Sequence, residues 1–151
     1  MRQAVHDLKY RNYKSLAAPL AKLLSDYWRD HSIVGDVLVP VPLHRSKLRS
    51  RGYNQSELIA GELGKRVGLP VITTALVRQR NMMPQVRTAG IEQRWANATG
   101  AFECRSLALQ GKRVVLLDDV CTTGATLDAA ARCIISAGAS SVCGLTIARE
   151  V

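Results

Sequence analysis

The sequence is poor in aromatic residues and contains no long apolar run. Aromatic residues make up 5% of its 151 residues, so we expect a core built mainly from Leu, Val, Ile and Ala. No apolar run approaches the roughly 18–20 residues that cross a bilayer. The N-terminal residues also lack the apolar stretch and cleavage site of a signal peptide. These absences predict a cytoplasmic protein that does not insert into a membrane.

Paired cysteines are also missing. The sequence has four cysteines, Cys104, Cys121, Cys133 and Cys143, and no two of them form a C-x-x-C pair. This spacing matches neither a zinc knuckle nor the disulfide framework of a small secreted domain. We therefore expect free, mostly buried thiols.

Acidic residues are scarce relative to basic ones. The sequence has 12 Asp and Glu residues against 21 Lys and Arg residues, which gives a formal net charge of +9. Such an excess favours polyanionic partners, namely phosphorylated small molecules, nucleic acid or acidic proteins, and the total charge does not separate these classes. Four of the cations fall within seven residues: Arg45, Lys47, Arg49 and Arg51.

A helix is predicted near the N-terminus, within a helical region over residues 1–35. Its apolar residues recur at helical spacing: Leu16, Leu20, Leu23 and Tyr27. Pro19 fits the first turn of this helix, with Ser15 as its N-cap. The remainder, residues 36–151, is predicted to be the core of the same single domain, which spans residues 1–151.

Short strands and helices alternate over this core region. The predicted elements are a strand at 37–39, a helix from an Asn54 N-cap to Val67, a strand region at 71–77, a strand at 114–117, a helix with an apolar stripe between Leu127 and Ile135, and a strand at 142–148. Residues 79–99 show little periodicity and are predicted to form a long loop. The alternation predicts an open, mostly parallel sheet flanked by helices, with ligands at the carboxyl ends of the strands.

Residues 114–126 carry the strongest functional signal, with the sequence VVLLDDVCTTGAT. A buried strand leads into Asp118 and Asp119, then into a hydroxyl-rich turn with one glycine, then into a helix. Gly124 lets the backbone approach an anion closely, and the first N–H groups of the helix complete a phosphate cradle. The two carboxylates can accept hydrogen bonds from vicinal ribose hydroxyls and help to hold a hydrated Mg²⁺. This ordered combination is specific, whereas an Asp-Asp pair or a Thr-Gly pair alone is common.

The segment resembles the phosphoribosyl-pyrophosphate signature of type I phosphoribosyltransferases, and the chain resembles the amidophosphoribosyltransferase-like ComF family of competence proteins. The matching stretches are Asp7-Leu8-Lys9-Tyr10-Arg11, Val39-Pro40-Val41-Pro42-Leu43-His44-Arg45, Arg51-Gly52-Tyr53-Asn54-Gln55, Pro84-Gln85, Arg94, Asn97, Gly100-Ala101-Phe102, residues 114–126 and Ala148-Arg149. Many family members also carry an N-terminal four-cysteine zinc module, which nothing in this sequence matches. The resemblance implies a type I phosphoribosyltransferase-like α/β fold with a small hood, assigned to the N-terminal helix, and a flexible loop over residues 79–97.

The resemblance also assigns roles to individual residues. The 5′-phosphate would bind Thr122, Thr123, Gly124, Ala125 and Thr126, while Asp118 and Asp119 would contact the ribose and Mg²⁺. Pyrophosphate would bind the stretch 40–45 and the basic residues after it: Val41, Pro42, Arg45, Lys47 and Arg51, with His44 as a further candidate. Arg45 is favoured because its planar fork can bind two phosphate oxygens. Lys47 and Arg49 could instead form a solvated basic face.

In the flexible loop, Arg94 would reach the leaving pyrophosphate when the loop closes over an oxocarbenium-like sugar and excludes water. A surface arginine packed on Trp95 is the alternative role. Purine-salvage relatives place an acid at the position of Thr122, so the threonine argues against hypoxanthine or guanine as the acceptor. No evident base activates Cys121, so a covalent role is not expected for it.

Two functions remain open. The resemblance implies a phosphoribosyltransferase that uses 5-phosphoribosyl-1-pyrophosphate and Mg²⁺, releases pyrophosphate and acts on an unidentified acceptor, in the setting of DNA uptake during competence. The alternative is a non-catalytic accessory protein that binds the same ligand or single-stranded DNA, with Tyr53 and Trp95 as candidate stacking residues. A competence helicase and a second copy of the chain are further candidate partners. The sequence contains neither a G-x-x-x-x-G-K-[ST] loop nor a G-x-G-x-x-G turn, which excludes the common ATP- and dinucleotide-binding folds.

Overall fold

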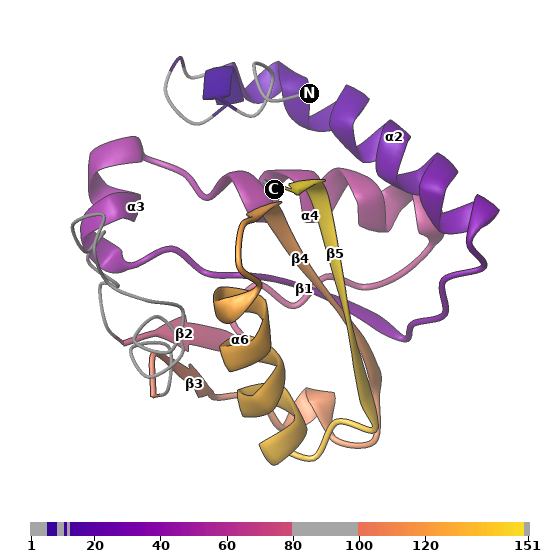
Figure 1. Ribbon diagram of the computed structural model, residues 1–151, viewed down its shortest axis with the longest axis vertical. Helices are drawn as coiled ribbons and strands as arrows, with labels where there is room; N and C mark the ends of the chain where they lie inside the picture. Colours follow the sequence, from indigo (N-terminus) through magenta and orange to yellow (C-terminus); the bar gives the residue numbers. More distant parts are fainter. Residues whose placement is uncertain (1–5, 9–10, 12, 80–99, 150–151) are drawn as a thin grey trace.

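The computed structural model describes residues 6–8, 11, 13–79 and 100–149 (Figure 1). A helical turn at residues 6–8 comes first. The elements that follow are η1 (Lys14–Leu16), α2 (Ala17–Asp30), β1 (Val37–Pro40), α3 (Arg45–Arg51), α4 (Gln55–Val67), β2 (Leu76–Arg78), β3 (Phe102–Cys104), η2 (Leu107–Leu109), β4 (Arg113–Cys121), α6 (Ala125–Ser136) and β5 (Ser141–Arg149).

Strands β1, β4 and β5 form a parallel sheet in the order β1-β4-β5. The predicted mostly parallel sheet flanked by helices is therefore confirmed. The prediction of one strand region over residues 71–77 is wrong, because two separate pairings divide it. Val71 makes a single parallel bridge to Leu38, whereas β2 pairs antiparallel with β3 in a second, two-stranded sheet.

The central strand β4 is buried on both faces, and its side chains divide the core into two halves. Val115 and Leu117 face a cluster that contains residues of α2 and α4. Val114 and Leu116 face the opposite cluster, which contains residues of α6, β2 and β3. Because side chains alternate along a strand, this one run of apolar residues joins the helical layers on the two sides of the sheet (Figure 1).

Helix α2 packs against α4 with a different face from the one its sequence predicted. The buried residues are Ala17, Leu20, Ala21 and Leu24, whereas Leu23 and Tyr27 are 50% and 49% exposed. Both sets have helical spacing, and the small alanines allow a closer approach to α4, so the buried face is rotated from the predicted stripe. Ser15 is not the N-cap as predicted, because it lies inside η1 and α2 begins only at residue 17.

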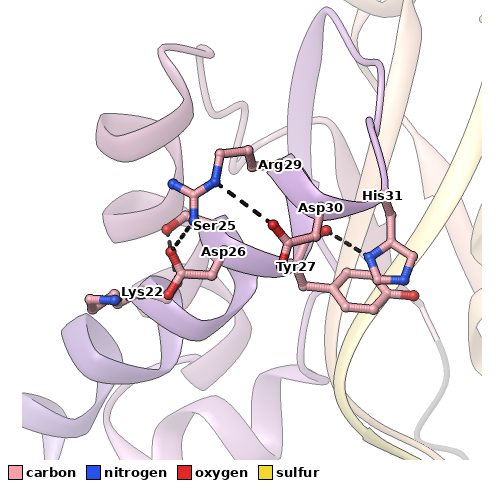
Figure 2. A network of polar contacts seen from close by, with 7 residues as sticks. All are labelled: Lys22, Ser25, Asp26, Tyr27, Arg29, Asp30 and His31. Carbon is pink, nitrogen blue, oxygen red and sulfur yellow. Dashed lines mark hydrogen bonds and ion pairs between the residues drawn. The ribbon is translucent and has the colours of Figure 1, made fainter.

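Figure 2 shows the solvent-facing polar contacts near the end of α2. Asp26 accepts hydrogen bonds from Lys22 Nζ at 2.8 Å and from Arg29 Nη2 at 3.0 Å. The rings of Tyr27 and His31 stack with their centroids 3.8 Å apart. Such exposed i, i+3 and i, i+4 contacts support the helix locally.

The basic residues that follow β1 lie on the helix α3, which was not predicted from the sequence. His44 caps its start, since His44 Nδ1 accepts from the backbone N–H of Ser46 at 3.3 Å. Gly52 ends it with a left-handed φ of 83°. Helix α4 follows at once with Asn54 as its N-cap and ends at Gly68, as predicted.

Asp36 and Arg113 join the starts of β1 and β4. The Asp36 carboxylate accepts hydrogen bonds from Arg113 Nε at 3.0 Å, Nη2 at 2.7 Å and the Arg113 backbone N–H at 2.8 Å. These bonds and the guanidinium charge hold the pKa of Asp36 well below its usual range.

We expect Asp36→Asn to lower the urea midpoint at neutral pH, by an amount that shrinks in acid. A depressed folded-state pKa stabilises the protein fully above the unfolded-state value of about 3.9, and this contribution is lost as the pH falls from there toward the folded-state pKa. Urea denaturation at about pH 7 and about pH 3 measures the change. Asp30→Asn is the matched control, because the Asp30 carboxylate is exposed and lies 3.8 Å from Arg29, which is too far for a hydrogen bond. Equal differences at the two pH values would contradict the prediction.

The four cysteines are free thiols, as predicted, but they are less buried than expected. Cys104, Cys121 and Cys133 are half-buried and Cys143 is exposed. Burial raises the pKa of the Cys133 thiol, which makes that thiol less reactive at neutral pH. Within the described ranges, no helix has the length and apolar character that crossing a bilayer requires.

Candidate functional site

Asp118 and Asp119 lie within β4, near its carboxyl end. The strand continues beyond the predicted residues 114–117 because β5 pairs with it past the acidic pair, with Asp118 opposite Thr146 and Cys121 opposite Arg149. Asp119 is only 4% exposed, and Asp118 is half-buried. Carboxylates at such positions need hydrogen-bond donors to offset the loss of water.

Donors come from β4 itself and from the first turn of α4. Gln55 Nε2 donates to Asp119 Oδ2 at 2.8 Å, and Ser56 Oγ donates to Asp118 Oδ1 at 3.2 Å. The backbone N–H of Val120 donates to Asp119 Oδ1 at 2.7 Å, and that of Asp119 donates to Asp118 Oδ1 at 2.9 Å. Both carboxylates are therefore oriented by the fold before any ligand arrives.

Gln55 and Ser56 were not predicted to belong to the site, although the sequence holds a signal for their burial. Gln55 lies four residues before Ile59, and Ser56 lies seven residues before Leu63, so both fall on the apolar face of α4. They are 3% and 1% exposed. A polar residue on a buried face needs a partner, but helical periodicity does not say which one.

The turn after β4 leads directly into α6. Gly124 has a left-handed φ of 82° at the N-cap of this helix, a conformation that favours glycine. Thr122 and Thr123 are exposed, Thr126 is half-buried, and Ala125 is buried with its N–H 3.4 Å from Thr123 Oγ1. The first N–H groups of a helix have no intrahelical acceptor, so this turn offers backbone and hydroxyl donors to an anion.

The stretch that follows the neighbouring strand β1 offers positively charged side chains more than free backbone N–H groups. The N–H of Val41 donates to the carbonyl of Leu117 at 2.8 Å within the sheet, and Pro42 has no N–H. Arg45 and Lys47 are exposed on α3. Arg51 is half-buried, and its Nη1 donates to Gln55 Oε1.

Asn54 ties this stretch to the start of α4. Its Oδ1 accepts from the backbone N–H of Ser56 at 3.1 Å, and its Nδ2 donates to the carbonyl of Val41 at 3.0 Å. Asn54 is 6% exposed, so both bonds are shielded from water. One side chain therefore caps a helix and fixes the chain that leaves β1.

Arg78 is a cation near the acidic pair that the sequence analysis did not single out. Its guanidinium carbon lies 5.3 Å from the centroid of the Phe102 ring. Burial lowers the pKa of Arg78, and the charge of Asp118 raises it, which places this half-buried cation in the field of the acidic pair. No local pattern in the sequence points to it, because only the fold brings Arg78 within electrostatic range of Asp118.

Other predicted site residues lie outside the described part of the chain. These are Arg94, Trp95 and nearly all of the predicted flexible loop. The acidic pair is the remaining basis for the predicted Mg²⁺ site, since the described residues contain no group of three or more His, Cys, Asp or Glu side chains that could hold a metal ion. Two carboxylates suit Mg²⁺ that keeps several waters and shares ligand phosphate oxygens, rather than a cage built by the protein alone.

Residues 14–149 match the phosphoribosyl transferase domain family. The chain is 34% identical over 115 residues to Competence protein ComFC of Bacillus subtilis, covering 76% of this chain and 45% of that protein. It is 29% identical over 148 residues to Competence protein F of Haemophilus influenzae, covering 91% and 63%. With DNA utilization protein YhgH of Escherichia coli it shares 31% over 144 residues, covering 91% and 62%. The chain thus spans less than two thirds of the length of these relatives.

Solved structures with the same fold include phosphoribosyltransferases. Glutamine phosphoribosylpyrophosphate amidotransferase from B. subtilis superposes with a TM-score of 0.59 at 19% identity, covering 87% of this chain and 26% of that one. Adenine phosphoribosyltransferase from Leishmania donovani superposes with a TM-score of 0.55 at 16% identity, covering 89% and 53%. At these identities the likeness establishes the fold, and the type I phosphoribosyltransferase-like prediction is confirmed.

Proposed function

The chain belongs to the ComF family of the phosphoribosyltransferase superfamily, and from this premise we propose that it binds 5-phosphoribosyl-1-pyrophosphate with Mg²⁺ and transfers the phosphoribosyl group to an acceptor. Pyrophosphate would be the leaving group. The competence-related names of its relatives support a role in DNA uptake.

The observation that carries this proposal is the acidic pair beside the turn at Gly124. Asp118 and Asp119 are oriented by four hydrogen bonds, and the Gly124 turn follows at the same strand end. A ligand that joins a ribose to a 5′-phosphate fits this arrangement, because the carboxylates can accept from vicinal hydroxyls while the turn donates to the phosphate. Ligands of open parallel sheets bind at this edge.

The pyrophosphate would lie toward the cations that follow β1. Arg45 and Lys47 are exposed there, and β1 is the direct neighbour of β4. Arg78 of β2 adds a positive charge within electrostatic range of Asp118. These cations would stabilise negative charge that develops on the leaving group. The acidic pair would hold Mg²⁺ through water, and the ion would supply further charge neutralisation to the pyrophosphate when bound.

Isothermal titration calorimetry tests the proposal. The chain is expected to bind 5-phosphoribosyl-1-pyrophosphate in the presence of Mg²⁺ with micromolar affinity, about 8 kcal/mol. Ribose 5-phosphate or pyrophosphate alone should bind more weakly, since each fills only part of the site. Absence of binding by the wild-type chain would contradict the proposal. If binding is found, pyrophosphate release with candidate acceptors would separate a transferase from a binding module.

A second candidate function is contact with single-stranded DNA by a non-catalytic protein. Helix α3 favours it, because Arg45, Lys47 and Arg49 are exposed there and its seven residues include no acid. However, Tyr53 is only 8% exposed and its hydroxyl donates to the carbonyl of Leu8, so it offers no stacking face; the other candidate, Trp95, lies outside the described residues. Electrostatic attraction alone supports this function, and we rank it second. Salt-dependent binding to an oligonucleotide is the next measurement if the calorimetric titration fails.

A further inference from the structure

The junction between α3 and α4 makes a series of long-range polar contacts. Tyr53, Asn54, Gln55 and Ser56 reach partners that lie 45, 13, 64 and 62 residues away in sequence. The partners belong to the N-terminal segment, the stretch after β1 and the two carboxylates of β4. This junction therefore connects the parts of the chain to which the proposed function assigns pyrophosphate and ribose.

Gln55 occupies the middle of a three-residue chain of hydrogen bonds. Its Oε1 accepts from Arg51 Nη1, and its Nε2 donates to Asp119 Oδ2 at 2.8 Å. Arginine can only donate and an ionised carboxylate can only accept, so these two neighbours fix which way the amide points. The Gln55 side chain is 3% exposed, so water does not compete for either bond.

We propose that Gln55 is a positioning residue that orients Asp119 for ribose binding and links the acidic pair to the basic helix α3 through Arg51. Ser56 orients Asp118 in a similar way, because its hydroxyl donates a hydrogen bond to Asp118 Oδ1. This inference rests on the proposed function for its ligand, but the hydrogen-bonded chain can be tested without any ligand.

The variant Gln55→Glu separates the two bonds of this chain. The introduced carboxyl can still accept from Arg51, but when ionised it places an oxygen against Asp119 where a donor is required. The charged groups around this position are Arg51, Asp118 and Asp119. The variant therefore keeps the bond to Arg51 and replaces the bond to Asp119 with a repulsive contact between two carboxylates.

The first test is calorimetric titration of Gln55→Glu with 5-phosphoribosyl-1-pyrophosphate and Mg²⁺. We expect binding about tenfold weaker than wild type. Gln110→Glu, the same change at an exposed position, should match wild type. A Gln55→Glu affinity equal to that of wild type would overturn the inference.

Hydrogen exchange supplies the measurement without ligand. The Val120 amide donates to Asp119 Oδ1, so it should exchange faster in Gln55→Glu than in wild type, while amides in the middle of β4 keep their rates. An unchanged exchange rate at Val120 would contradict the inference that Gln55 orients Asp119. If the wild type binds no 5-phosphoribosyl-1-pyrophosphate, the proposed function fails, and the exchange result alone decides whether Gln55 orients Asp119.

Discussion

The double variant Asp118→Asn/Asp119→Asn is expected to bind 5-phosphoribosyl-1-pyrophosphate with Mg²⁺ at least about 100-fold more weakly than wild type, about 2.7 kcal/mol. In the proposed site, two acceptors of charge-assisted hydrogen bonds from the ribose would be replaced by neutral amides, and each such bond contributes about 1.5–3 kcal/mol. The proposed anchoring of Mg²⁺ would be lost at the same time. Calorimetric titration against wild type measures the change.

The direction of this effect distinguishes a built site from general electrostatics. The ligand is an anion, so removal of two negative charges would strengthen a non-specific attraction to this basic chain. The proposed site predicts the opposite. Asp128→Asn is the matched control, because Asp128 lies in the first turn of α6 and pairs with Arg132 at 2.6 Å instead of facing the acidic pair. Equal or tighter binding by the double variant would show that the carboxylates do not contact the ligand.

The fold of this variant must be checked alongside its affinity. Gln55 Nε2 and the Val120 N–H both donate to Asp119, so an asparagine amide at this buried position meets at least one donor. A mismatch of this kind costs about 1–3 kcal/mol in stability. Urea denaturation should show a cooperative transition at a lower midpoint, and titration below that transition isolates the effect on binding.

The second large effect, a loss of stability, is expected from substitution of Gly64 in α4. Gly64→Ala should destabilise the protein by about 1–3 kcal/mol, because its new Cβ would lie 2.7 Å from Val71 Cγ2 and 2.8 Å from the carbonyl oxygen of Leu69. The backbone oxygen cannot rotate away as a side chain can. Helix α4 would have to move from the segment after it, and α4 is the element that presents Gln55 and Ser56 to the acidic pair.

Gly61→Ala provides the control within the same helix. A Cβ at this position meets nothing within 4 Å. The substitution should therefore raise stability by about 0.5–1 kcal/mol, since alanine has the higher helix propensity. Urea midpoints of the two variants should move in opposite directions. Two changes of the same sign would contradict the close approach between α4 and residues 69–71.

The local features of this protein can be predicted from its amino-acid sequence. A continuous apolar run identified the central strand, and an N-capping residue and a C-terminal glycine marked the ends of α4. Within residues 114–126, the acidic pair, the turn at Gly124 and the start of a helix follow one another without interruption. Features of this kind can be predicted because neighbouring residues create them through backbone geometry, capping and side-chain period. The sheet class followed from the alternation of such elements.

The buried face of α2 and the partners of the acidic pair depend on packing between distant segments. The periodicity of α2 allowed two faces, and packing against α4 selected the one with Ala17 and Ala21 rather than Leu23 and Tyr27.

Gln55 and Ser56 donate hydrogen bonds to the acidic pair across 64 and 62 residues of sequence, and the charge of Arg78 acts on Asp118 from β2. A buried polar side chain is satisfied by whatever donor or acceptor the folded chain places beside it, and no local pattern specifies that partner.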